Sequence, residues 1–84
     1  MILRLMGKIA RVRGNLDTAR QYLDESVNQF KAINNQLELG RTYVEIARWA
    51  KAAGNLLETK SFLEIGEEIF ERLGAGLDLA EIQS

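Results

Sequence analysis

The sequence repeats itself at an offset of 40 residues. The triplet Gly-Asn-Leu at residues 14–16 recurs at residues 54–56, and sliding residues 1–44 onto residues 41–84 leaves eight identical pairs. These identities fall on glycine turns and on apolar positions, where a fold is specified. Two copies of one unit favour an architecture in which similar units stack on each other.

Each unit has the pattern of two helices joined by a short turn. Apolar residues at helical spacing precede Gly14 and Gly54, and a second helix is predicted over residues 16–33 and again over residues 56–73. Glycine just past a helix end adopts a left-handed backbone at little cost. A turn this short makes the two helices of a unit antiparallel neighbours. No strand-like alternation of useful length occurs, so the predicted fold class is all-α.

An asparagine follows each turn glycine, where it can cap the next helix. Asn55 has Glu58 three residues later, which is the spacing of a capping box. Asn15 has Thr18 at that place, which predicts a weaker cap.

Composition removes several classes of function. The 84 residues include no His, Cys or Pro, and 11 basic residues oppose 12 acidic ones. The sequence therefore offers no thiol nucleophile and no imidazole base, lacks the usual zinc ligands, and has no basic surplus for nucleic acid. No apolar stretch approaches the ~18 residues of a membrane span, and no signal peptide is visible. We expect a cytoplasmic, non-catalytic chain that needs no cofactor and binds neither nucleic acid nor a membrane.

The positions of the repeated residues resemble the tetratricopeptide repeat family. The first unit supplies Leu3, Met6-Gly7, Ala10, Gly14-Asn15-Leu16, Ala19, Leu23 and Ser26, and the second supplies Tyr43, Ile46-Ala47, Ala50, Gly54-Asn55-Leu56, Thr59, Leu63 and Gly66. The period of 40 exceeds the common 34 and is similar to a longer-period subclass found in large bacterial signalling and transcription-regulating proteins. The resemblance implies an α-solenoid of antiparallel helix-turn-helix repeats that acts in protein–protein interaction.

The repeat frame divides the chain into repeat 1 (1–35), repeat 2 (36–75) and a truncated third-repeat helix (76–84). In this frame Leu77, Leu79 and Ile82 have no following helix to pack against. We therefore predict self-association, with a symmetric dimer as the default closed form and head-to-tail stacking as the open one. A short array that stays monomeric is the alternative. The same frame fits either a short natural protein or a fragment of a longer tetratricopeptide-containing regulator.

Charge separates the two kinds of helix. Residues 1–13 and 41–53 contain seven basic residues and one acidic residue, whereas residues 17–33 and 57–73 contain eight acidic and four basic residues. In the family, the first helices line a concave groove. The resemblance places these residues there: Arg4, Lys8, Arg11, Arg41, Val44, Arg48 and Lys51. A basic groove implies a protein or peptide partner with carboxylates, which arginine can bind with two hydrogen bonds.

Alternatives remain for these surfaces. The basic residues are also explained by simple solvation or by pairing with acidic neighbours, and a purely architectural homo-oligomer is the main rival to peptide binding. Trp49 fits either a ligand anchor or a packing residue against the neighbouring repeat or the third helix. Gly7 and Gly66, within predicted helices, indicate close helix packing.

Overall fold

The computed structural model describes residues 2–83 and is all-helical over that range. The helices there are α1 (Ile2–Val12), α2 (Leu16–Ala32), α3 (Gln36–Ala52), α4 (Leu56–Leu73) and α5 (Gly76–Gln83). The predicted all-α class is therefore confirmed. Residues 1 and 84, which the predicted repeat boundaries include, lie outside the described residues.

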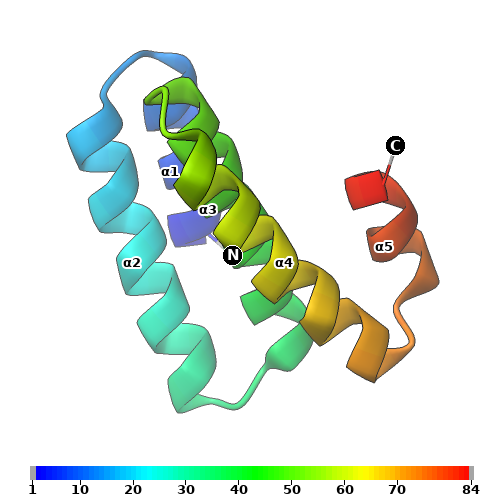
Figure 1. Cartoon of the computed structure of the whole chain (residues 1–84). Helices are drawn as coiled ribbons and strands as arrows, with labels where there is room; N and C mark the ends of the chain where they lie inside the picture. The colour runs from blue at the N-terminus through cyan, green and yellow to red at the C-terminus, as the bar shows by residue number, and fades with distance from the viewer. Residues whose placement is uncertain (1, 84) are drawn as a thin grey trace.

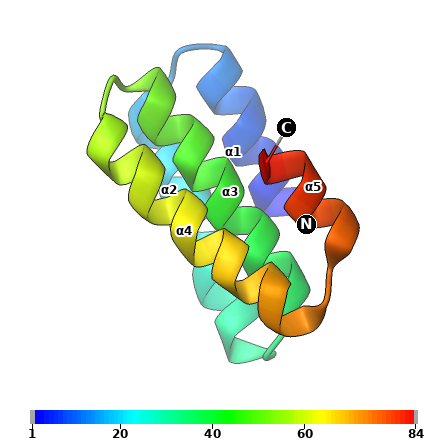
Figure 2. The same ribbon diagram turned by 45° about the vertical axis from the view of Figure 1, so that its right-hand side comes forward.

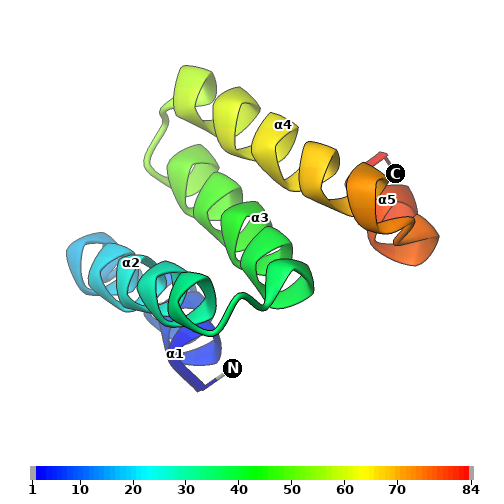
Figure 3. The ribbon, with the colours of Figure 1, turned by 90° about the horizontal axis from the view of Figure 1, so that it is seen from below.

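The first four helices form two antiparallel hairpins, α1–α2 and α3–α4, that lie side by side (Figure 1). Each helix packs against its neighbours along the chain, and α1 also contacts α3. Seen from below, α5 lies at the C-terminal part of α4, on which it packs (Figure 3). In the turned view, α5 and the N-terminal end of α1 lie on the same side of α3 (Figure 2). Helices α1, α3 and α5 therefore share one face of the molecule.

The two hairpin turns have the same backbone geometry. Gly14 has a φ of 84° and Gly54 a φ of 78°, both in the left-handed region that glycine adopts most easily. The side chain of Asn55 accepts a hydrogen bond from the backbone N–H of Glu58 at 3.0 Å. Asn15 makes no side-chain cap bond. The predicted difference between the two caps is thus confirmed.

The core lies between the two hairpins and includes a buried hydroxyl pair. Its fully buried large side chains include Leu23, Ile46 and Phe70, from α2, α3 and α4. Thr42 Oγ1 donates to the backbone oxygen of Glu38 at 2.9 Å and lies 3.3 Å from Ser26 Oγ. Because the Thr42 proton is engaged on the helix backbone, Ser26 is the donor between the two hydroxyls. This bond joins α2 to α3 inside the core.

Glycines allow the closest helix approaches. A Cβ added at Gly7 would lie 2.8 Å from Leu23 Cγ, and one added at Gly66 would lie 3.0 Å from Val44 Cγ2. Real Cβ atoms rarely come so near to a neighbour, so both positions favour glycine over alanine despite its lower helix propensity. The predicted close packing at Gly7 and Gly66 is confirmed. Among residues 2–83, no helix has the length and apolar character needed to cross a bilayer.

Candidate interaction groove

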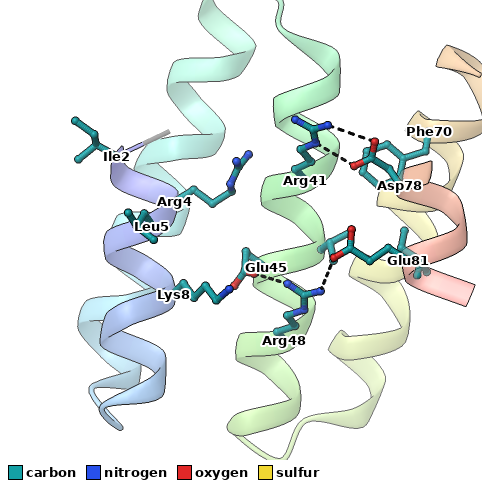
Figure 4. A pocket seen from close by; sticks show the side chains of 12 residues that line it. Ile2, Arg4, Leu5, Lys8, Arg41, Glu45, Arg48, Phe70, Asp78 and Glu81 are labelled. Atoms are coloured by element: carbon teal, nitrogen blue, oxygen red, sulfur yellow. Dashed lines mark hydrogen bonds and ion pairs between the residues drawn. The ribbon is translucent and has the colours of Figure 1, made fainter. Parts of the chain in front are cut away.

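A groove of about 440 Å³ opens on the face shared by α1, α3 and α5 (Figure 4). Its apolar surface comes from every element around it, and charged side chains from α1, α3 and α5 surround that surface. The lining residues are Ile2, Arg4, Leu5, Lys8, Arg41, Val44, Glu45, Arg48, Phe70, Asp78, Glu81 and Ile82.

The structure brings together most of the residues predicted for a groove. Arg4, Lys8, Arg41, Val44 and Arg48 line the cavity. Arg11 and Lys51 do not line it.

Arg11 lies next to α3 instead. Its Nη2 is 3.8 Å from Glu45 Oε2, and its side chain is largely buried in that contact. Lys51, in the last turn of α3, is exposed to solvent.

Carboxylates that the charge count did not place in the groove neutralise much of it. Glu38 accepts hydrogen bonds from Arg4 and, at 2.7 Å, from Arg41 Nη1. Glu38 belongs to a groove helix because α3 begins at Gln36, whereas the charge count covered residues 41–53. The signal in the sequence was its place three residues after the capping Asn35, whose side chain accepts the Glu38 backbone N–H at 3.2 Å.

Glu38 is held as a carboxylate by its two partners. Burial by itself would raise the pKa of the Glu38 carboxyl. The hydrogen bonds from Arg4 and Arg41, with the charges of the same two residues, outweigh burial and hold the pKa below its ordinary value of 4.5. The carboxyl of Glu38 is therefore ionised at neutral pH and ties α1 to α3.

A second carboxylate, Glu45, is buried seven residues further along α3. Arg48 Nη1 donates to Glu45 Oε1 at 2.6 Å, and Arg11 approaches the other oxygen from α1. Both α3 carboxylates thus bind one arginine of α1 and one of α3. The two levels differ in strength, because Glu38 accepts a hydrogen bond from Arg4, whereas Glu45 Oε2, at 3.8 Å from Arg11, is buried with no hydrogen-bond partner in the described part of the chain.

The opposite wall is α5, which supplies two more acidic side chains. Arg41 Nε donates to Asp78 Oδ1 at 2.9 Å and Arg41 Nη2 donates to Asp78 Oδ2 at 3.4 Å, a two-pronged contact. These bonds and those to Glu38 raise the pKa of the Arg41 guanidinium, although burial opposes them. Glu81 Oε1 lies 3.6 Å from Arg48 Nη2. The contacts hold α5 against the groove arginines (Figure 4).

Lys8 differs from the other groove cations. It extends from α1 toward α3 (Figure 4), and no ion pair of its amine is found among residues 2–83. Figure 4 shows its side chain reaching toward Glu45, and the apolar residues Ile2, Leu5 and Val44 line the same groove. The groove thus combines an accessible ammonium group with apolar surface.

The residues predicted for self-association have two different environments. Leu77 is 89% exposed. Leu79 and Ile82 are half-buried and pack against the core of the same chain, and Ile82 also lines the groove. Leu77 alone among these three projects its side chain fully into solvent.

Trp49 packs between the hairpins. Its indole Nε1–H donates to the backbone oxygen of Leu16 on α2 at 2.7 Å. The guanidinium carbon of Arg20, also on α2, lies 4.8 Å from the centre of its ring. Of the two interpretations of this residue, the structure shows the packing one.

A large apolar surface remains on α1, on a face other than the one that packs on α2. Helical spacing aligns its side chains, which are 37–75% exposed: Ile2, Leu5, Met6, Ile9 and Val12. We call these five residues the α1 stripe. Leu5 and Ile2 border the groove, whereas Met6, Ile9 and Val12 lie outside it.

The chain has no detected relative. No protein-family model, no curated protein and no solved structure matches it. The resemblance to tetratricopeptide repeats therefore rests on the residues of this sequence and stays a prediction. Within residues 2–83, no three or more acidic side chains are grouped as ligands for a metal ion.

Proposed function

We propose that this chain is a non-catalytic protein-interaction module whose groove binds a short peptide segment with apolar and acidic side chains. The observation that supports it is that Lys8 lines one open groove together with the apolar side chains of Ile2, Leu5 and Val44. The apolar side chains of a ligand gain from leaving water, and its carboxylate gains from the ammonium group.

The ion pairs within the groove determine which cations are available to a ligand carboxylate. Arg41 and Arg48 already contact Asp78 and Glu81 of α5, so a ligand carboxylate exchanges one pair for another at these arginines and gains little. Lys8 has no such partner within the described part of the chain. Selectivity for an acidic ligand therefore comes mainly from Lys8, and affinity from the apolar surface of the same groove.

The test uses a fluorescein-labelled octapeptide in which Leu or Ile alternates with Asp or Glu, and a control peptide with Asn and Gln at the acidic positions. Fluorescence anisotropy should show binding of the acidic peptide that weakens as salt is added. The Lys8→Glu variant should weaken binding about tenfold, since it replaces attraction by repulsion. Lys51→Glu makes the same charge change outside the groove and should bind normally.

Equal binding of both peptides would contradict the acidic preference. Equal weakening by Lys8→Glu and Lys51→Glu would show that net charge, and not the groove, governs binding.

The proposed architecture is a tetratricopeptide-like α-solenoid of about two repeats and part of a third. It is supported by the matching turns at Gly14 and Gly54 and by the packing of each helix mainly on its chain neighbours. In this proposal the chain works either on its own or as part of a larger signalling or transcription regulator.

Homo-oligomerisation is the second proposed function, favoured by the α1 stripe. Five apolar side chains aligned on one exposed face form the kind of surface that marks an interaction site. Light scattering after size exclusion tests it directly. A mass that rises with protein concentration supports self-association, and one constant monomer mass would contradict it.

A further inference from the structure

The α1 stripe has a buried counterpart in the second hairpin. Shifted by 40 positions, Ile2 corresponds to Thr42 and Met6 to Ile46, and both α3 residues are almost fully buried. Ile9 corresponds to Trp49, which bonds to Leu16 of α2. The face that α1 exposes is thus the face with which α3 packs on the preceding helix.

The surface that would receive such a face is open on α4. Leu16 of α2, where Trp49 docks, is half-buried, whereas its counterpart Leu56 is 73% exposed. Leu23 is fully buried, whereas its counterpart Leu63 is only half-buried. The N-terminal half of α4 therefore lacks the cover that α3 gives to α2.

Helix α5 covers only the other half of α4. Its residues correspond to the first eight of α3, and its Leu79 and Ile82 pack beside the core. The residues of α1 correspond to the last eleven of α3.

The charges of the two helices are opposite. Helix α1 contains Arg4, Lys8 and Arg11 and no acidic residue, which gives a charge of +3, although Arg4 and Arg11 lie against the α3 carboxylates and Lys8 is the exposed cation of the three. Helix α4 contains five glutamates against Lys60 and Arg72, which gives −3. Opposite charge favours the approach of α1 to α4 of another copy and disfavours the approach of α1 to α1.

We propose that a second copy of this chain packs the α1 residues Met6 and Ile9 on the N-terminal half of α4, next to α5. The inference rests on the self-association proposed above and specifies its geometry. The interface joins two different surfaces, so a pair of copies keeps one surface of each kind free and association continues head to tail.

The proposed geometry distinguishes apolar residues inside the interface from equally exposed ones outside it, which nonspecific hydrophobic association would not do. Val12 corresponds to Ala52, which is exposed in α3, so Val12 lies outside the proposed interface although it is 71% exposed. Leu57 corresponds to the exposed Asp17 and lies outside it in the same way. Each side of the interface thus offers a matched control on the same helix.

The experiment measures the mass of the full chain by light scattering over a range of concentrations. Ile9→Glu places a negative charge on α1 against the acidic α4, and Leu56→Lys places a positive charge on α4 against the basic α1. Each should raise the concentration needed for association at least about tenfold. Val12→Glu and Leu57→Lys should associate like the unmodified chain. Circular dichroism checks that all four variants are folded.

Mixing the two interface variants gives the decisive result. Ile9→Glu keeps its α4 surface and Leu56→Lys keeps its α1 surface, so an equimolar mixture should form a complex of two chains that grows no further. A monomeric unmodified chain overturns both this proposal and self-association itself. Association that Ile9→Glu abolishes while Leu56→Lys leaves it unchanged overturns the head-to-tail geometry alone, and self-association stands.

Discussion

The two hairpins have the same turn and differ in how well their first helices are buried. Helix α3 lies between α2 and α4, and its buried residues include Thr42, Glu45 and Ile46. Within residues 2–83, α1 packs mainly on α2 and α3, and its buried residues are Gly7 and Ala10. Two helices of related sequence are thus buried to different extents because they occupy different places in the stack. A helix gains most of its stability from the faces that neighbouring helices cover.

The largest expected effect on stability comes from truncating the leucine that occupies the same position in both hairpins. Leu23→Ala should cost about 2–5 kcal/mol of unfolding free energy, because Leu23 is fully buried and truncation leaves a cavity. Leu63→Ala should cost about 1–2 kcal/mol, because Leu63 is half-buried and already contacts water. Urea denaturation in dilute solution measures both. Equal losses would show that the two hairpins are equally packed.

A smaller effect on stability is expected at the position where the first hairpin has glycine and the second has alanine. Gly7→Ala would push a methyl group to 2.8 Å from Leu23 Cγ, and we expect a net loss of about 1–3 kcal/mol. The reciprocal Ala47→Gly makes no clash and loses helix propensity and a buried methyl group, about 1–2 kcal/mol. Thermal unfolding compares the two. A Gly7→Ala variant more stable than the unmodified chain would contradict the close approach of α1 and α2.

The smallest effects come from the groove carboxylates, and they depend on pH. The pKa of Glu38 is lower in the folded chain than its ordinary value of 4.5, so this carboxylate stabilises the fold above that pH. The contribution is lost as pH falls through the folded-state pKa. Glu38→Gln should cost about 1–2 kcal/mol at pH 7, and the difference from the unmodified chain should shrink toward pH 3.

Glu81→Gln is the matched control, because its side chain is 70% exposed and faces Arg48 at the edge of the groove. It should change stability by about 0.5 kcal/mol or less at either pH. Urea midpoints at pH 7 and pH 3 measure both variants. A Glu38→Gln difference that stays constant with pH would exclude the carboxylate as its source.

The sequence predicted the parts of the fold that local patterns determine. Both turns, both second helices and the stronger cap at Asn55 follow from residues within a few positions of each other. The pairing of Arg41 with Asp78 joins residues 37 positions apart and depends on how α5 folds back from α4. A repeat pattern shows which residues share a helix face, but it does not give the angle between helices that brings two side chains into contact.

In the groove, too, some features could be predicted from the sequence and others depend on how the helices pack. The family resemblance placed six basic residues on one surface, and the structure brings four of them together there: Arg4, Lys8, Arg41 and Arg48. Their neutralisation by Glu38 escaped a count that began at residue 41.

The single tryptophan makes the joint between the hairpins visible in solution. Trp49 bonds to α2 from α3, and Arg20 stacks on it, while α5 and the groove lie elsewhere on the molecule. Its fluorescence emission should therefore shift when the two hairpins separate and stay constant when α5 alone is released. Comparing that emission with far-ultraviolet circular dichroism through a denaturant titration would distinguish loss of the stacking between units from loss of the helices themselves.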